Sequence, residues 1–281
     1  MTDDTRIPAL PLVPHPRRRR WGVSPGDCDS IVVWFSCGAA SAVAWNETVR
    51  LYGGRCEVTA VNHPVAEEDP DNRRFAEDVA AWVGAPLIEW ASPSYPSGSA
   101  VDVWQSVRAM SFPHGAPCTM HLKKRARQDY EKHHRVDWHV LGFTVEESAR
   151  HERFALGERE NTLPVLIDQR ITKPDCMERI TRAGIRLPDV YRRGYPNANC
   201  IGCVKATSPT YWNHVRRADP ETFEARASLS RELGVRLVRV AGERIFLDEL
   251  PPRAQGAPMA DALADCGIFC EEPTPAEGDG V

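Results

Sequence analysis

Residues 31–44 read Ile-Val-Val-Trp-Phe-Ser-Cys-Gly-Ala-Ala-Ser-Ala-Val-Ala, which is the most informative stretch of the chain. A short apolar run is typical of a buried strand, and the small residues after it are typical of a tight turn that opens into a helix. Backbone N–H groups at the first turn of a helix have no partner within that helix and lie at its positive end. The stretch therefore predicts an anion site, of the kind that binds phosphate.

The turn contributes six consecutive residues to the predicted phosphate site: Ser36, Cys37, Gly38, Ala39, Ala40 and Ser41. The two serines bracket the turn and can add hydroxyl donors, and Gly38 allows the backbone to approach a ligand closely. The turn lacks the Gly-Lys-Thr/Ser ending of P-loop kinases and is not the three-glycine dinucleotide fingerprint. An ordinary strand-to-helix turn, in which the small residues serve only packing, is the alternative.

Strand and helix patterns alternate from residue 30 onwards. Strands are expected at 30–36, 57–62, 86–90 and 137–141, and helices at 39–51, 70–83, 99–109 and 118–133. This alternation predicts an α/β fold with a doubly wound, mostly parallel sheet. Ligands of such sheets bind beyond the carboxyl ends of the strands, so we expect the loops after the first, second and fourth strands to line one site.

The chain of 281 residues is long enough for one large domain, or for one domain with an appendage. We expect a disordered arm over residues 1–28, a nucleotide-binding α/β domain with an irregular cysteine-bearing loop over 29–210, and a helix-and-hairpin region with a tail over 211–281. The net charge of −4 gives no global reason to expect nucleic-acid binding. Because no apolar run suits a membrane span or a secretory signal, we expect a cytoplasmic protein without membrane contact.

Nine cysteines are many for a cytoplasmic chain, where disulfides are rare. Cys200 and Cys203 form a Cys-x-x-Cys pair, Cys118 precedes a basic stretch, and Cys266 and Cys270 lie near the C-terminus. Such a set is suited to an iron–sulfur cluster, to a structural zinc ion or to a dithiol redox couple. A Cys-x-x-Cys pair that arose by chance is the remaining alternative, and the residue types alone do not separate iron from zinc.

The Ser-x-Gly-x-x-Ser pattern of residues 36–41 resembles the pyrophosphate loop of the ATP pyrophosphatase, or PP-loop, superfamily. Ala40 stands where synthetases of this superfamily usually carry Asp, which favours the branch of the phosphoadenosine phosphosulfate (PAPS) reductases. Residues 163–203, with a Gly-Ile-Arg-Leu-Pro turn and a Gly-Tyr pair before Cys-Ile-Gly-Cys, resemble the same stretch of that family. The resemblance implies a Rossmann-like PP-loop fold that binds an adenine nucleotide.

The resemblance also implies a set of cluster ligands. Iron–sulfur members of the family place a Cys-Cys pair where Cys118 and Thr119 stand in this chain. This correspondence implies a cluster, of the 4Fe-4S type, held by Cys118, Cys200 and Cys203. Because Thr119 replaces one usual ligand, Cys270 is the expected fourth ligand; Cys266 in its place, or a cluster with one open iron for substrate, is the alternative.

Cys266 resembles the catalytic cysteine near the C-terminus of sulfonucleotide reductases, where it stands in a Glu-Cys-Gly-Leu/Ile-His motif. Here the motif reads Asp-Cys-Gly-Ile-Phe, so Phe269 replaces the histidine. The resemblance implies that Cys266 is the nucleophile, and ligation of the metal group by Cys266 is the alternative.

Further nucleotide contacts follow from the resemblance. His63, at the end of the second strand, stands where the family contacts the adenine or ribose. Gly142, Arg150 and Arg153 stand where the family binds a sulfate or phosphate group, which the planar guanidinium fork suits. Lys123 is expected to contact phosphate or the cluster. A solvent-exposed charged helix is the alternative for the two arginines.

The resemblance implies an oxidoreductase acting on a sulfur group, or a sulfurtransferase. It would bind ATP or a sulfonucleotide, use an iron–sulfur cluster, and take a thiol reductant or a sulfur donor as its partner. ATP-dependent thiolation of a nucleobase in tRNA or another nucleic acid is the alternative, which the arginine run 17–20 and the basic stretch 121–127 favour. A zinc-stabilised nucleotide-binding regulatory module is the second alternative.

Overall fold

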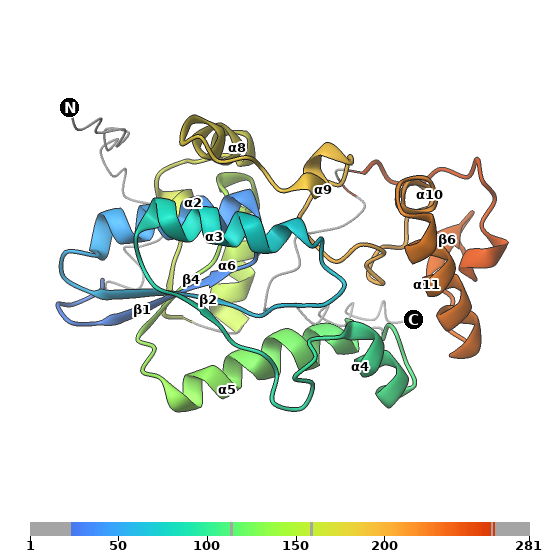
Figure 1. Cartoon of the computed structure of the whole chain (residues 1–281), viewed down its shortest axis with the longest axis horizontal. Helices are drawn as coiled ribbons and strands as arrows, with labels where there is room; N and C mark the ends of the chain where they lie inside the picture. The colour runs from blue at the N-terminus through green and yellow to red at the C-terminus, as the bar shows by residue number, and fades with distance from the viewer. Residues whose placement is uncertain (1–23, 113–114, 158–159, 260, 262–281) are drawn as a thin grey trace, which may run out of the picture. The chain divides into compact units, whose positions relative to one another are not determined.

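The computed structural model describes residues 24–112, 115–157, 160–259 and 261 (Figure 1). The chain divides into two compact units whose segments alternate along the sequence. The first unit combines the residues up to 63 with 70–90 and 130–189, and the second combines 64–69 and 91–129 with the residues from 190 onwards. The expected boundaries at residues 28 and 210 follow the linear order of the chain and stay predictions.

A five-stranded parallel sheet forms the centre of the first unit, in the order β3-β2-β1-β4-β5. The strands are β1 (Ser30–Phe35), β2 (Glu57–Asn62), β3 (Leu87–Glu89), β4 (Trp138–Val140) and β5 (Thr162–Leu163). From β1, the chain first adds β2 and β3 on one side of the sheet and then adds β4 and β5 on the other side. The strand order therefore reverses between β1 and β4, which flank a topological switch point. The predicted fold class, α/β with a doubly wound parallel sheet, is confirmed.

Helices cover both faces of this sheet. Alternate residues of β1 point to opposite faces, so Ile31, Val33 and Phe35 join the apolar core against α2 (Ala39–Tyr52). Figure 1 shows α2, α3 (Asp71–Val83) and α8 (Lys173–Arg182) along this face. On the other face, Trp34 contacts Tyr130 of α5 (Arg125–His133) edge to face. The first unit also contains η2 (Val145–Glu147), α6 (Ser148–Gly157) and α7 (Val165–Asp168).

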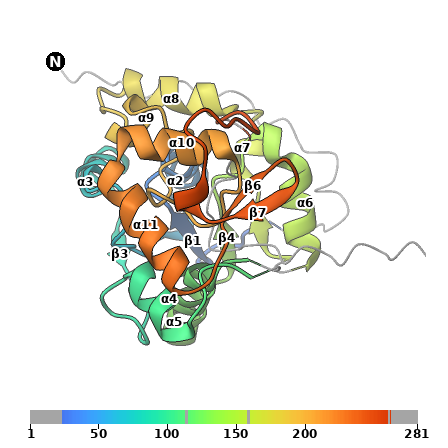
Figure 2. The ribbon, with the colours of Figure 1, turned by 90° about the vertical axis from the view of Figure 1, so that its right-hand side faces the viewer.

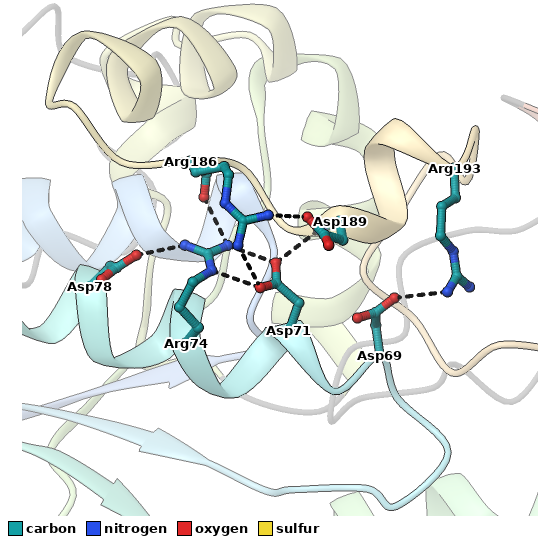
Figure 3. Close-up of polar contacts among 7 residues, drawn as sticks. All are labelled: Asp69, Asp71, Arg74, Asp78, Arg186, Asp189 and Arg193. Atoms are coloured by element: carbon teal, nitrogen blue, oxygen red, sulfur yellow. Dashed lines mark hydrogen bonds and ion pairs between the residues drawn. The ribbon is translucent and has the colours of Figure 1, made fainter.

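An ion-pair network fixes the start of α3 to residues 186–189 of the same unit (Figure 3). The Asp71 carboxylate accepts hydrogen bonds from Arg74 Nη2 at 2.7 Å, from Arg186 Nη2 at 3.0 Å and from the Asp189 backbone N–H at 2.9 Å. The hydrogen bond from Arg74 is the main reason why the pKa of Asp71 falls to about 2. The network therefore holds Asp71 ionised at neutral pH.

The second unit has its own apolar core, which includes Trp104, Trp212 and Phe223 as well as Cys203. Figure 2 shows helices α10 (Pro209–Ala218) and α11 (Pro220–Glu232) beside the antiparallel hairpin of β6 (Val238–Val240) and β7 (Glu243–Ile245). The remaining elements are α4 (Ala100–Val107), the π-helical segment η1 (Thr119–Lys124), α9 (Asp189–Arg192) and η3 (Leu247–Glu249).

The helices of the described residues are short. The longest, α2, has 14 residues, and α3 and α11 have 13 each. A membrane span needs about 20 mostly apolar residues. Within the described ranges, no helix combines that length with sufficient apolar character.

Candidate functional site

The predicted phosphate loop lies at the carboxyl end of β1, at the switch point of the sheet. Gly38, which has no side chain to cap the helix, is the N-cap residue of α2. Ligands of open α/β sheets bind at this position, and the positive end of a helix attracts anions. The loop therefore has the place and the polarity that a phosphate site requires.

The two serines of the loop bond to each other. Ser41 Oγ accepts hydrogen bonds from the Ser36 backbone N–H and the Ser36 hydroxyl, both at 3.2 Å. Ser41 Oγ donates to the Gly38 carbonyl at 2.9 Å. The serine hydroxyls thus hold the loop in a closed turn, which leaves the backbone and the helix terminus as its main means of binding an anion.

Cys37 takes the left-handed backbone conformation, with a φ of 56°, which is uncommon for a residue other than glycine. Its side chain is buried, and Cys37 Sγ accepts a 3.6 Å hydrogen bond from the Asn62 side chain. The same Asn62 amide donates to the Phe35 carbonyl at 2.9 Å. Asn62, at the end of β2, therefore fixes the start of the phosphate loop, a role that the sequence analysis missed.

Gly142, two residues after the end of β4, lies against the first turn of α2. A Cβ at this position would be 2.6 Å from Ser41 N, 2.9 Å from Ser41 Cα and 3.0 Å from the Ala40 carbonyl carbon. These distances are too short for any side chain, so the site requires glycine. The loop after β1 thus contacts the last residue of β2 through Asn62 and the segment after β4 through Gly142; that the loops after these strands line one binding site stays a prediction.

Arg150 and Arg153 lie on α6 in the same unit as the loop. Arg150 forms an ion pair with Glu147 at 2.7 Å, and its guanidinium stands 5.3 Å from the centre of the Phe143 ring. Arg153 is exposed. Arg150 is thus held in a defined position, whereas the exposed setting of Arg153 suits the alternative of a solvated charged helix.

His63 is buried at the end of β2. Its Nδ1 lies 2.7 Å from the Trp90 carbonyl oxygen, and its ring stacks on Trp34 with 5.5 Å between the ring centres. His63 therefore has a packing role in the first unit, and its predicted contact with adenine or ribose stays a prediction.

Cys200 and Cys203, in the second unit, flank a turn that hydrogen bonds hold in place. Gly202, between Cys200 and Cys203, has a φ of 68°, a conformation that glycine favours. The turn is held by hydrogen bonds from the Ile201 N–H to the Glu67 carbonyl at 3.0 Å and from the Cys203 N–H to the Tyr211 hydroxyl at 2.9 Å. Cys203 is buried and Cys200 is half-buried.

Cys203 belongs to the apolar cluster of the second unit, and Cys118 and Cys200 pack against the same cluster. Burial lowers the pKa of Arg226, and the charges of Glu67, Cys200, Cys118 and Cys203 act against that shift. Arg226 stands over Trp104 of the same cluster, so its guanidinium and the three cysteines share one part of the second unit. Thiol donors of this number suit three corners of an iron–sulfur cluster, because its cysteines bind different irons. Cys266 and Cys270 lie outside the described residues.

The described residues show no compact site for a single metal ion. Within them, no group of three or more His, Cys, Asp or Glu side chains is placed to hold one ion. A cluster spreads its ligands over several irons, so its cysteines do not need to converge on one point. The arrangement of Cys118, Cys200 and Cys203 is therefore compatible with the predicted donor set, and the choice between iron and zinc stays a prediction.

Two basic residues of the stretch 121–127 are buried in the second unit. Lys123 Nζ lies 3.1 Å from Glu68 Oε1, and both side chains are only 8% exposed. Arg127 is also buried. Lys123 thus neutralises an internal carboxylate, and the phosphate loop belongs to the other unit.

In a comparison with known proteins, no family model matches the chain, and no curated protein matches it either.

Proposed function

We propose that this chain is a PAPS reductase-like enzyme of the PP-loop superfamily. It binds an adenine nucleotide through residues 36–41 and carries out sulfonucleotide reduction or sulfur transfer with a cysteine-bound iron–sulfur cluster. The observation that carries the proposal is the contact of Gly142 with the backbone of Ala40 and Ser41 at the switch point of the sheet. This contact forms a cradle of backbone atoms at a helix N-terminus, where phosphate groups bind.

The residues of the first unit bind and orient the nucleotide in this proposal. The positive end of α2 attracts the phosphate, and the bonds of Ser36 and Asn62 keep the loop in shape before the ligand arrives. Arg150, already positioned by Glu147, adds a guanidinium for the sulfate or phosphate oxygens. Because the loop is already ordered before the nucleotide binds, little of the binding free energy is lost in ordering it.

Cys118, Cys200 and Cys203 would hold the cluster, with Cys270 as the fourth ligand. When bound, the cluster supplies either charge that polarises the sulfate or sulfide for transfer. In the sulfonucleotide reaction, the Cys266 thiolate attacks the sulfur, a sulfur–sulfur bond forms and the nucleotide leaves with the electron pair of the broken sulfur–oxygen bond. An external thiol then forms a disulfide with Cys266 and releases sulfite.

Thiolation of a nucleobase is the second candidate, and the structure reduces one argument for it. The basic stretch 121–127 favoured contact with nucleic acid, but Lys123 and Arg127 of that stretch are buried. We therefore place sulfonucleotide reduction first. A zinc-stabilised regulatory module is the third candidate and predicts a protein without catalytic turnover.

A single-turnover assay separates these candidates. The anaerobically purified chain is mixed with adenylylsulfate or PAPS and a thiol, and sulfite is measured; parallel samples contain ATP and tRNA, and AMP is measured. We expect sulfite from the wild-type protein and none from Cys266→Ser. If AMP forms only when tRNA is present, nucleobase thiolation becomes the better-supported function and sulfonucleotide reduction is contradicted. Nucleotide binding without either product would contradict an enzyme of this class.

A further inference from the structure

Arg226 is a buried charge with an unusual environment. The residue lies in α11 and is 5% exposed, and its Nε is buried with no hydrogen-bond partner among the described residues. Its guanidinium stands over the Trp104 ring, 4.7 Å from the ring centre. A buried charged donor without a hydrogen bond destabilises a fold, so Arg226 lowers the stability of the metal-free protein unless another charge compensates it.

The side chain of Arg226 packs directly against the Cys-x-x-Cys turn. A Cβ at Gly202 would lie 3.3 Å from Arg226 Cγ and 3.7 Å from Arg226 Nε. The unpaired Nε is therefore next to the backbone that separates Cys200 from Cys203. Glycine at position 202 leaves the room that this approach needs.

Glu67 is the carboxylate in electrostatic range of Arg226, and its oxygens have other partners. They accept hydrogen bonds from the Ala100 and Val101 N–H groups at 2.8 and 3.1 Å and from the Ser99 hydroxyl at 3.1 Å. Glu67 thus caps the start of α4, and it compensates Arg226 only at a distance. Cys118, Cys200 and Cys203 pack in the same apolar cluster as Trp104, on which Arg226 stands, and their thiols carry negative charge only as thiolates.

We propose that Arg226 is a positioning residue that acts as the buried counter-charge for Cys118, Cys200 and Cys203 when they bind a metal group as thiolates. This inference rests on the cysteine site of the proposed function. Metal binding converts neutral thiols into a set of thiolates around one guanidinium, so the charge that destabilises the metal-free protein stabilises the loaded one. Arg226 thereby couples occupancy of the site to the packing of α11 on the cysteine turn.

A purely structural role of Arg226 makes a different prediction. Arg216 provides the matched comparison, because its guanidinium also stands over an aromatic ring, 4.3 Å from the centre of Phe223 in the same unit. Burial lowers the pKa of Arg216 as well, but the opposing charge is Glu224 and no thiol contributes. A change at Arg216 should therefore affect the metal-free and the loaded protein alike.

The test compares Arg226→Met, Arg226→Lys and Arg216→Met in the full chain, each metal-free and after anaerobic reconstitution with iron and sulfide. The readouts are the midpoint of thermal unfolding and the rate at which a chelator removes the metal. We expect Arg226→Met to leave the metal-free protein as stable as the wild type or more stable, and to weaken metal retention by about 10- to 100-fold. Arg226→Lys keeps the charge and should retain most of the wild-type affinity.

The outcomes distinguish a failure of the counter-charge role of Arg226 from a failure of the cysteine site itself. If Arg226→Met lowers the stability of both forms equally, as Arg216→Met is expected to do, the counter-charge role is wrong while the cysteine site stands. If the wild-type protein retains no metal, the cysteine site itself fails and the inference fails with it. Should Arg226→Met not fold, Arg226→Gln replaces it as the neutral variant, and equal metal retention by the Gln and Lys variants would overturn the inference.

Discussion

Gly142 and Ser41 touch through their backbones: a Cβ on residue 142 would stand 2.6 Å from the Ser41 amide nitrogen. Residue 142 follows β4 and residue 41 lies in the first turn of α2, so this contact joins the two strands that flank the switch point. The anion site proposed for this chain depends on that approach.

Gly142→Ala is expected to move the phosphate loop. The added methyl group cannot be accommodated at 2.6 Å from backbone, so the variant should lose about 1–3 kcal/mol of stability and at least tenfold in affinity for an adenine nucleotide. Calorimetric titration with nucleotide and urea unfolding measure the two effects. Gly54→Ala is the control, because a Cβ at Gly54 meets no atom within 4 Å. Wild-type affinity in Gly142→Ala would contradict the proposed position of the phosphate.

Asn62→Leu removes the side chain that links β2 to the loop. The Phe35 carbonyl and Cys37 Sγ lose their hydrogen bonds from Asn62, and an unsatisfied buried acceptor costs about 1–3 kcal/mol. We expect a loss of stability of that order and weaker nucleotide binding, both measured as for Gly142→Ala. If nucleotide saturates the variant at wild-type concentrations, the ordering role assigned to Asn62 is wrong.

Lys123 and Glu68 should behave as a buried ion pair. Lys123→Met leaves the Glu68 carboxylate buried without this ammonium group, which costs about 3–5 kcal/mol, whereas Lys123→Met combined with Glu68→Leu should cost much less. A double-mutant cycle by urea unfolding measures the coupling. Arg73→Met is the control, because the Arg73–Glu77 pair is exposed and should contribute little. Additive effects of Lys123→Met and Glu68→Leu would show that the pair is not coupled.

Asp71 should make the protein sensitive to acid. Its pKa falls from 3.8 to about 2 in the folded protein, so its contribution is present above about pH 4 and is lost as the pH falls towards 2. The contribution is on the order of 2 kcal/mol. Asp71→Asn should be less stable at pH 7 and should lose part of the steep decline in stability below pH 4. Glu77→Gln, at an exposed position, should keep that decline. An unchanged decline in Asp71→Asn would contradict the network in Figure 3.

Local patterns in the sequence predicted most of the first unit. The apolar run of β1 and the small residues after it placed the loop and α2 almost to the residue, and β2 lies at 57–62 as expected. β5 was not predicted, because its two residues are too few to show a period and the strand exists only through pairing with β4. α10 was not predicted either, although Ser208 and Pro209 form an ordinary helix-start signal.

The site was predictable only in part, for physical reasons. The loop of residues 36–41 was predicted because the geometry of strand, turn and helix is local, whereas Gly142 was predicted only through the family resemblance. The burial of Lys123 and the counter-charge position of Arg226 depend on which segments pack together, and the two units combine segments that are distant in the sequence. An arginine within a helical pattern carries no local signal that it will be buried.

A cysteine-bound iron–sulfur cluster can be tested by measuring the iron, sulfide and zinc content and the visible absorption spectrum of the anaerobically purified full chain. We expect a brown protein with about four irons and matching sulfide per chain, since cysteine ligation of this kind supports a cubane cluster. A colourless protein that holds zinc, or no metal, would contradict the cluster and with it the proposed sulfur chemistry.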